Sequence, residues 1–420
     1  MHRAGCVTSA PGSGYRTKVF LLLRPSCIDN AVSPLCVASP VSATTPSVRL
    51  SSFYFWYYGL LGIMHPFWPL FLSDRQFTAT EIGQLLAIQV GTRIISPNLW
   101  GWLADRVDRM TTIRLGAALG AVFFAAIFVA EGFWALALVM AGYSFFWNAV
   151  MPQFEALTLD HLRSEPHRYS DIRLWGSVGF VLAVVAGGYW FEGRIDDFRV
   201  AGLVLLGMIW LSSLWVPRAE RRFRRPRARG VRRVLRRGSV QAFLLMAFLL
   251  QVAHGIYYAF FSLQLEAVGY GRGAIGLFWA LSVVAEIVLF MVMRRLLSRW
   301  SPWQILAVSL ALTALRWLLI GHASDWLVML LLAQCLHAFS FGACHAVSVD
   351  YLRRFFPRGL LGQGQAIYSA AGFGAGGAAG ALLGGLLWQY GGGWTFSVAA
   401  LITLLALGVA WLGLSQRRSH

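Results

Sequence analysis

The feature that most constrains this chain is a succession of long apolar runs separated by short segments that carry its arginines. Runs such as Leu115–Ala130 and Phe396–Leu414 contain no charged residue. A helix needs about 20 predominantly apolar residues to cross a bilayer. Only 13% of the 420 residues are charged, whereas soluble domains average about 25%. These observations exclude a soluble enzyme and predict an all-α membrane protein with many spans.

Twelve apolar segments follow Ser51, and they predict twelve transmembrane helices. The expected ranges are 51–72, 79–104, 110–130, 132–160, 171–191, 198–216, 240–266, 271–293, 302–321, 325–352, 361–388 and 393–414. The segment 217–238 carries eleven arginines and divides these spans into two sets of six. We therefore expect an N-terminal six-helix bundle at 51–216, a basic cytoplasmic linker at 217–238 and a C-terminal six-helix bundle at 239–414.

The two ends of the chain differ from the apolar body. Residues 1–50 are rich in Ser, Pro and Ala, and their one apolar stretch, Val19–Leu23, is too short to span a bilayer. No clear signal-peptide cleavage pattern follows it. We expect 1–50 to be a disordered tail, with an over-extended translation start as an explanation and a targeting role as the alternative, and 415–420 to be a cytoplasmic tail.

The net charge of +18 reflects arginines placed between the spans. Loops on one expected side of the membrane, with the adjoining helix ends, hold 25 arginines after Ser51, and those on the other side hold Arg75, Arg194, Arg199 and Arg272. Cytoplasmic loops of membrane proteins carry such an excess of Lys and Arg. The asymmetry predicts that both termini are cytoplasmic. A basic chain can also bind nucleic acid, but this sequence has no zinc-finger spacing and no stretch of alternating aromatic and basic residues, so we expect no nucleic-acid partner.

A degenerate internal repeat indicates that the two halves of the chain are related. Trp175-Gly-Ser-Val-Gly-Phe180 in the fifth span corresponds to Tyr368-Ser-Ala-Ala-Gly-Phe373 in the eleventh. The loop after the second span, 101–109, corresponds in place to 294–302 after the eighth. Paired six-helix halves are typical of secondary transporters that work by alternating access.

The loop Gly101-Trp-Leu-Ala-Asp105-Arg106-Val-Asp108-Arg109 resembles the loop motif of the major facilitator superfamily. Further stretches resemble one branch of it: His65-Pro66-Phe67-Trp68-Pro69 is similar to the opening of the lactose permease group. Arg173-Leu-Trp-Gly-Ser-Val-Gly-Phe180 and Gln334-Cys-Leu-His337 are similar to bacterial phenylpropionic acid transporters. The resemblance covers 51–414 and implies the superfamily fold, a location in the bacterial inner membrane, and import of a small aromatic carboxylate with protons as the coupling ion.

Arg93 is the first candidate for binding the substrate. It lies in the middle of the second expected span, one turn before Pro97. An ionisable side chain within a membrane is costly unless it faces a cavity or a partner. A guanidinium is always charged and has the planar geometry that a carboxylate matches. We expect Arg93 to bind an anionic substrate; a bond to backbone carbonyls of a neighbouring helix is the alternative.

Two pairs of charged residues follow from the resemblance to the permeases. Glu155 and Arg173 match an acid–arginine pair that helps hold the substrate, and a salt bridge joining the fourth and fifth spans is the alternative. Glu286 and Arg316 match a pair involved in binding and proton coupling. A carboxylate in an apolar cavity takes up a proton more readily than one in water. Glu286 is therefore the expected coupling acid, with a purely structural pair as the alternative.

Aromatic and histidine side chains complete the expected site. His254, Tyr258 and Phe261 lie on one stripe of the seventh span. With Tyr57 and Trp279, which are chosen by helix face, they are expected to line the substrate cavity, although such a stripe also suits simple packing. His337 and His345 lie two turns apart on the tenth span and are expected to relay protons; a tether between helices is the alternative.

A conformational latch is expected at the loop motif. There Asp105, Arg106 and Arg109 stand at one cytoplasmic helix end and can pair with a neighbouring helix. In the eleventh span Gly372, Gly376, Gly380 and Gly384 recur every four residues, which allows close helix approach.

Several sequence features bear on functions other than transport of an aromatic acid. A sugar or nucleoside symporter is the nearest alternative, but Ser340 stands where the sugar permeases carry a second acid, and the eleventh span has no lysine. A non-transporting receptor needs neither paired halves nor a proton-carrying acid. No nucleophile–base pair for an intramembrane enzyme, and no cofactor or metal spacing, is visible, and the five cysteines suggest unpaired thiols. The expected partners are the substrate, an organic anion, and the lipid bilayer, and the expected state is a monomer.

Overall fold

The computed structural model describes residues 46–163, 165–219 and 230–415. Most of the expected N-terminal tail, the centre of the linker and most of the C-terminal tail lie outside these ranges. Within them, regular structure is helical throughout, so the predicted all-α fold class is confirmed.

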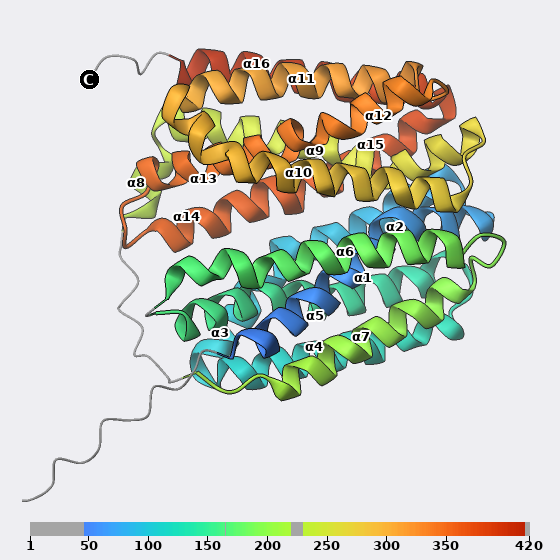
Figure 1. The fold of residues 1–420 in the computed structure, drawn as a ribbon, viewed down its shortest axis with the longest axis horizontal. Coiled ribbons are helices and arrows are strands. Elements are labelled where there is room, and N and C mark those ends of the chain that lie inside the picture. Colours follow the sequence, from blue (N-terminus) through green and yellow to red (C-terminus); the bar gives the residue numbers. More distant parts are fainter. Residues whose placement is uncertain (1–45, 164, 220–229, 416–420) are drawn as a thin grey trace, which may run out of the picture. The chain divides into compact units, whose positions relative to one another are not determined.

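The N-terminal bundle is formed by the first seven labelled helices (Figure 1). They are α1 (Ser47–Asp74), α2 (Ala79–Gly91), α3 (Ser96–Arg106), α4 (Arg109–Ala125), α5 (Gly132–His161), α6 (Tyr169–Trp190) and α7 (Asp197–Trp215). Here α1 packs against α6 and α7, and α4 packs against α5 and α7. The first helix begins four residues earlier than the sequence predicts.

The C-terminal bundle follows a five-residue helix, α8 (Val231–Leu235), which lies inside the range expected to be a linker. The bundle consists of α9 (Gly238–Val268), α10 (Arg272–Arg299), α11 (Pro302–His322), α12 (Leu327–Cys335), α13 (Cys344–Phe355), α14 (Leu361–Tyr368), α15 (Gly377–Leu387) and α16 (Gly392–Leu414). The helix α16 packs against α9 and α11, and α9 packs against α15.

Ten helical segments of the described chain are long and apolar enough to cross a membrane. Two more segments complete the twelve that the sequence predicts. One is α1, which is rich in Tyr and Trp and contains Pro66 and Pro69. The other is α2 with α3, which a short 3-10 helix, η1 (Thr92–Ile94), interrupts. Such a turn of 3-10 helix in the middle of a helix often marks a hinge or a functional position.

Two spans of the C-terminal bundle also depart from regular α-helix. Ala338–Ala343 (η4) joins α12 to α13 as a π-helix, and Ser369–Gly376 (η5) joins α14 to α15 in the same way. Such wide turns are frequent at functional sites. All three interruptions therefore lie in spans that carry candidate site residues or the glycine repeat.

Sequence signals explain several of the helix starts. Thr78 begins α2 with a capping box, in which its side chain accepts a hydrogen bond from the backbone of Glu81 while the Glu81 carboxylate accepts from the backbone of Thr78. Ser301 and Gln304 form the same arrangement at α11. Asp108 caps α4 by accepting from the Thr111 amide at 3.0 Å. Each cap satisfies backbone groups that a helix end leaves unpaired.

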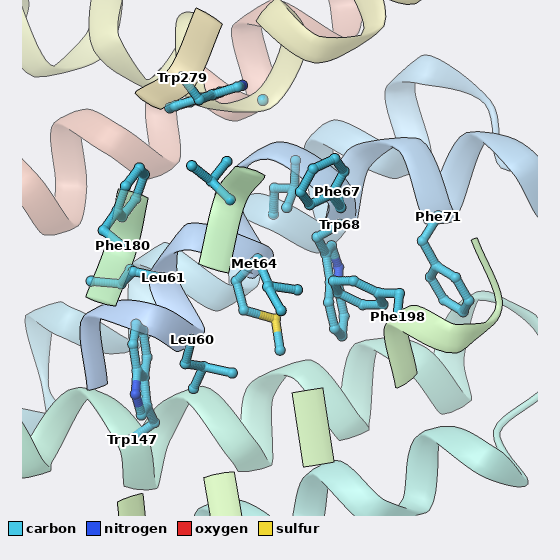
Figure 2. Close-up of a cluster of buried hydrophobic side chains, with 14 of the residues drawn as sticks. Leu60, Leu61, Met64, Phe67, Trp68, Phe71, Trp147, Phe180, Phe198 and Trp279 are labelled. Carbon is cyan, nitrogen blue, oxygen red and sulfur yellow. The ribbon is translucent and has the colours of Figure 1, made fainter. Parts of the chain in front are cut away.

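Aromatic side chains fill much of the N-terminal bundle. Trp68 packs edge-on against Phe198 with ring centroids 5.0 Å apart, and Phe71 stacks on the same ring at 5.3 Å. Figure 2 shows these rings together between α1 and α7. Burying such rings removes a large apolar area from water or lipid contact. Packing inside the bundle thus explains Trp68 and Phe71 of α1.

A salt bridge beyond the predicted spans joins the end of α1 to the start of α7. Arg75 donates to Asp196 at 2.8 Å. This hydrogen bond, with the charge of Arg199, holds the pKa of the Asp196 carboxyl below its usual value. The contact fixes one loop of the N-terminal bundle to another.

The two bundles contact each other within one compact unit, most extensively along four pairs of helical elements. These pairs are α2 with α15, α6 with α10, α1 with α9, and the interruption η1 with η5. Glycines permit the closest approaches: a side chain at Gly276 of α10 would place its Cβ only 2.5 Å from the Val184 carbonyl oxygen of α6. Gly83 of α2 stands in the same way against the Ala381 carbonyl of α15, at 2.5 Å; within the C-terminal bundle, the Val252 carbonyl of α9 leaves no room for a side chain at Gly380, in the predicted glycine repeat.

Candidate functional site: a charged cavity between the bundles

A cavity of about 300 Å³ lies between the two bundles. Its wall comes from α1, α2, η1, α5 and α6 on one side, and from α9, α10, α15 and the two π-helical regions on the other. The lining residues are Tyr58, Leu61, Met64, His65, Leu86, Gln89, Val90, Arg93, Trp147, Asn148, Arg173, Ser177, Phe180, Gln251, Gly255, Tyr258, Ala259, Trp279, Ser282, Val283, Glu286, His337, Phe341, Phe373, Gly377 and Ala381. The volume suits a small organic molecule.

Six of the residues that the sequence singles out are on this wall. They are Arg93, Arg173, Tyr258, Trp279, Glu286 and His337. They come from both bundles, although they are separated by up to 244 positions in the chain. The fold thus brings two guanidinium groups, one carboxylate and one imidazole of this set to a single space.

Arg93 is held at the 3-10 turn η1, where the second span is interrupted. Its Nε donates to Asn148 Oδ1 of α5 at 3.1 Å. Among the described residues, no acceptor is bonded to its two terminal nitrogens, and the side chain lines the cavity. This arrangement leaves the end of the guanidinium available to a ligand, with two parallel donors.

Arg173 of α6 is held by an aromatic face. Its Cζ lies 3.8 Å from the centroid of the Tyr58 ring, and the ring of Tyr54 lies 5.7 Å away. A cation over an aromatic ring is attracted by the negative face of the π system. Within the described ranges Glu155 and Arg173 form no ion pair, so the salt bridge between spans four and five is not found there. Glu155 is not among the residues that line the cavity.

Glu286 of α10 and His337 face each other in the C-terminal bundle. The carboxylate Oε2 lies 4.0 Å from Nε2 of His337. The imidazole ring stacks over Phe341, and Phe341 stacks over His345, with ring centroids 5.8 and 5.9 Å apart. Only the first two rings of this column line the cavity, so His345 stands behind the wall.

Arg316 does not lie where the resemblance to the permeases predicts, beside Glu286. It is fully buried in α11, where Nε donates to the Ala333 carbonyl at 3.0 Å and Nη1 donates to Ser340 Oγ at 3.3 Å. Its guanidinium also lies 4.1 Å from the Tyr257 ring. Because α11 packs against α16 behind the cavity-lining helices, Arg316 reaches neither the cavity wall nor, among the described ion pairs, Glu286.

Only part of the predicted stripe of His254, Tyr258 and Phe261 on α9 lines the cavity. Tyr258 lines the cavity, whereas Phe261 packs against the Trp279 ring and His254 against the Trp317 ring. His254 is fully buried, and its Nδ1 is 2.8 Å from the Leu250 carbonyl. Residues spaced i, i+3, i+4 and i+7 cover a broad face of a helix, and here only one edge of that face reaches the cavity.

Three rings from both bundles form an aromatic section of the wall. His65 of α1 lies 5.0 Å from Tyr258, and Tyr258 stacks on Trp279 at 6.0 Å. Trp279 is oriented by a 3.0 Å hydrogen bond from its indole nitrogen to Ser262. Tyr57 does not line the cavity; it stacks behind Trp147, which does.

The loop motif lies outside this cavity, at the ends of α3 and α4. Arg109 donates to Asp160 of α5 at 2.5 Å, and Arg163 pairs with the same carboxylate at 3.3 Å. The Arg106 guanidinium stacks 3.5 Å over the Trp102 ring. The pairing of Arg109 is therefore made within the N-terminal bundle.

An arginine joins the bundles at one end of the molecule. Arg272, at the start of α10, donates to the Phe191 carbonyl at 2.8 Å and lies 3.6 Å from Asp74, both in the N-terminal bundle. The same guanidinium lies 3.6 Å from Glu266 of α9. Next to it, the Gly273 amide donates to Glu192 at 3.1 Å. These contacts hold the two bundles together at this end.

Several wall residues were not identified from the sequence. Asn148, Gln89 and Gln251 are neutral amides within spans, and His65 was noted only as part of an aromatic–proline run. A polar side chain in an apolar span is a usable signal because it needs a partner. Which of these residues share one space depends on how the helices pack, so the signal alone could not assemble them.

Comparison with known proteins agrees with this architecture. The family model described as "MFS_1 like family" matches residues 47–398. The chain is 31% identical over 368 residues to the probable 3-phenylpropionic acid transporter of Escherichia coli, covering 84% of this chain and 94% of that protein. It is 26% identical over 367 residues to the maltose permease of Geobacillus stearothermophilus, covering 84% and 92%.

Solved structures show the same fold. A variant of the nucleoside transporter NupG superposes with a TM-score of 0.77 at 16% identity, covering 89% of this chain and 100% of that one. The peptide-family transporter PepTSo superposes with a TM-score of 0.70 at 13% identity, covering 89% and 99%. The chain therefore belongs to the MFS_1-like family of the major facilitator superfamily, and it is a multi-pass membrane protein and secondary transporter of a small molecule.

Proposed function

We propose that this transporter imports a small aromatic carboxylate together with protons across the bacterial inner membrane. The observation that carries the proposal is the pair of arginines on one cavity wall, Arg93 and Arg173. A guanidinium in a cavity of low polarity stays charged and has only donors, so it favours an anionic ligand. The 31% identical Escherichia coli relative, a probable 3-phenylpropionic acid transporter, supports the same substrate class.

The opposite wall suits the ring of such a substrate. Tyr258 and Trp279 stack on each other and reach the cavity from the C-terminal bundle. Aromatic faces contribute about 0.5–1.5 kcal/mol beyond area burial when they pair with another ring. A substrate whose carboxylate binds Arg93 and whose ring packs on Trp279 would contact both bundles at once, which links binding to their relative motion.

Proton coupling is assigned to Glu286 with His337. Both side chains line the cavity, and each can gain or lose a proton. Their 4.0 Å separation is short enough for an interaction that depends on protonation. His345 lies behind the wall with the Phe341 ring between it and His337, and a phenyl ring carries no proton, so this proposal gives the coupling role to Glu286 and His337 alone.

Alternating access would use the two ends of the cavity. The contacts of Arg272 close the end where the loops carry few arginines, and by the distribution of arginines this is the outer end. The described conformation then keeps the outer end closed, with both termini in the cytoplasm. A sugar symporter is the second candidate, because the Geobacillus maltose permease is 26% identical over most of the chain.

Uptake into energised membrane vesicles tests the proposal. Labelled phenylpropionate should accumulate, a protonophore should abolish accumulation, and labelled maltose should not enter above the level of vesicles without the protein. Accumulation of maltose without accumulation of phenylpropionate would replace the acid with a sugar. Uptake of phenylpropionate that ignores the protonophore would remove proton coupling.

Inhibition by an acid and by its amide tests the carboxylate clamp separately. Phenylpropionate should inhibit uptake far better than phenylpropionamide, because the amide cannot form charge-assisted bonds through both oxygens. Arg93→Gln should weaken inhibition by the acid about 100-fold, since charged hydrogen bonds are worth 1.5–3 kcal/mol each. Arg93→Lys, which keeps the charge without the planar fork, should fall between. Equal inhibition by acid and amide in the wild type would contradict the clamp.

A further inference from the structure

We infer that Asn148 is the positioning residue that aims Arg93 at an anionic ligand; this inference rests on the proposed function. Asn148 lies on α5 and is 6% exposed, at the edge of the cavity. Its Oδ1 accepts the hydrogen bond from Nε of Arg93 at 3.1 Å. Asn148 is a neutral amide, so its contact orients the guanidinium of Arg93 without neutralising the charge.

The orientation of the Asn148 amide is determined by its other hydrogen bonds. The Nδ2 group donates to the Gln89 carbonyl at 3.3 Å and to Thr92 Oγ1 at 2.8 Å. Turning the amide around would place Oδ1 against the Gln89 carbonyl oxygen and Nδ2 against the Arg93 Nε. The first pairing joins two acceptors and the second joins two donors. Only the observed orientation satisfies all three contacts.

The groups that hold Asn148 are themselves held. The Gln89 side chain donates to the Tyr143 hydroxyl at 2.6 Å. Thr92 Oγ1 lies 2.9 Å from the Gln89 carbonyl and 3.1 Å from Ser144 Oγ. The network therefore joins α2, the 3-10 turn η1 and α5. A ligand-binding group is precise only when its supporting contacts lock its position.

The contact with Asn148 determines which nitrogens of Arg93 remain available to a ligand. Asn148 takes the Nε edge of Arg93, and in the described part of the chain nothing accepts from Nη1 or Nη2. The remaining face of the guanidinium is its end, where two parallel donors match the two oxygens of a carboxylate. A carboxylate at position 148 would instead compensate the charge of Arg93 internally. The choice of a neutral amide here thus favours an anion as the ligand.

The test compares Asn148→Asp and Asn148→Leu with the wild type in membrane vesicles, measuring the inhibition constants of phenylpropionate and phenylpropionamide. Asn148→Asp is isosteric and should weaken inhibition by the acid at least about tenfold while leaving the amide within about twofold, because the new carboxylate competes for Arg93. Gln251→Glu adds the same charge to the opposite wall and gives the size of the general electrostatic effect. An equal loss in Asn148→Asp and Gln251→Glu would overturn the inference.

A double-mutant cycle with Arg93→Lys separates positioning from packing. If Asn148 aims the fork, Arg93→Lys should cost much less acid affinity in Asn148→Leu than in the wild type, because the fork is already misplaced. Additive losses would assign Asn148 to packing alone and overturn the inference. Protein amount and thermal stability are measured for each variant, so that only folded transporter is compared.

The failure of this inference differs from the failure of the proposed function. If Arg93→Gln leaves the preference for acid over amide unchanged, the carboxylate clamp itself is wrong. If Arg93→Gln abolishes that preference while both Asn148 variants keep it, Arg93 binds the anion without help from Asn148, and only the positioning role is lost.

Discussion

The Nε2 atom of His337 lies 4.0 Å from the Glu286 carboxylate, and both side chains face the cavity between the bundles. The permease resemblance predicts a different partner for Glu286, namely Arg316. In the structure that guanidinium is fully buried and bonded to Ala333 and Ser340. The carboxylate to which we assign proton coupling is therefore paired with an imidazole and not with Arg316.

Replacing Glu286 with Gln should abolish accumulation while sparing exchange. Glutamine keeps the shape of the side chain but cannot carry a proton between the two sides. Counterflow of labelled against unlabelled substrate should continue at a similar rate, and concentration against a gradient should be lost. Glu131→Gln, at an exposed position before α5, is the matched control. Normal accumulation by Glu286→Gln under an inward proton gradient would contradict the assignment of Glu286 as the coupling acid.

Replacing Trp279 with Leu should reduce the preference for an aromatic ring. The change should weaken inhibition by phenylpropionate about three- to tenfold relative to cyclohexylpropionate, which matches the energy of an aromatic pair. Trp326→Leu, at a position that is 66% exposed, controls for the loss of a tryptophan elsewhere. An unchanged ratio of the two inhibition constants would show that Trp279 does not contact the ring.

Replacing Asp105 with Asn should slow transport without weakening binding. A latch changes the balance of conformations by a coupling free energy of about 1–3 kcal/mol, which corresponds to a change of about 5- to 150-fold in the equilibrium between them. Equilibrium binding to purified protein is measured beside uptake. Asp108→Asn is the control, because Asn also serves as a helix cap at this position. Loss of equilibrium binding at normal expression would contradict the latch.

Replacing Arg272 with Gln should loosen the end of the molecule that this residue closes. Its contacts with Phe191 and Asp74 join the two bundles, and their loss should favour the state open at that end. A cysteine placed at Ser177, in a background without native cysteines, should react about tenfold faster with a membrane-impermeant thiol reagent added outside, since hydrogen bonds to charged groups are worth 1.5–3 kcal/mol.

The control for this experiment is Arg194→Gln. That arginine is exposed and pairs at 2.8 Å with Asp197 inside its own bundle. An equal rate of labelling in wild type and Arg272→Gln would show that the contacts of Arg272 do not govern opening.

The apolar runs and the arginines between them determined the fold class of this protein. In the membrane core no water is present to bond the backbone, so a long apolar segment forms its backbone hydrogen bonds within a helix. Runs such as Phe396–Leu414 therefore predict transmembrane helices. The loop motif at 101–109 and the repeated Gly-rich spans also indicated the superfamily, which the comparisons confirm. The sequence also identified Arg93 as a candidate site residue, because a charged side chain in an apolar span needs a cavity or a partner.

Only the tertiary structure decided which polar residues share a space. Helical periodicity gives the direction of a side chain but not the helix that it faces, so Arg316 and Arg93 look equivalent in the sequence. Packing places Arg316 behind the wall and Arg93 on it, beside Asn148. The interruption at Thr92–Ile94 has a sequence signal in Pro97, which cannot donate a backbone hydrogen bond to Arg93, whereas the interruption at Ala338–Ala343 contains no proline. The sequence determined that this chain folds into membrane-spanning helices, and the packing of those helices decided where its charges meet.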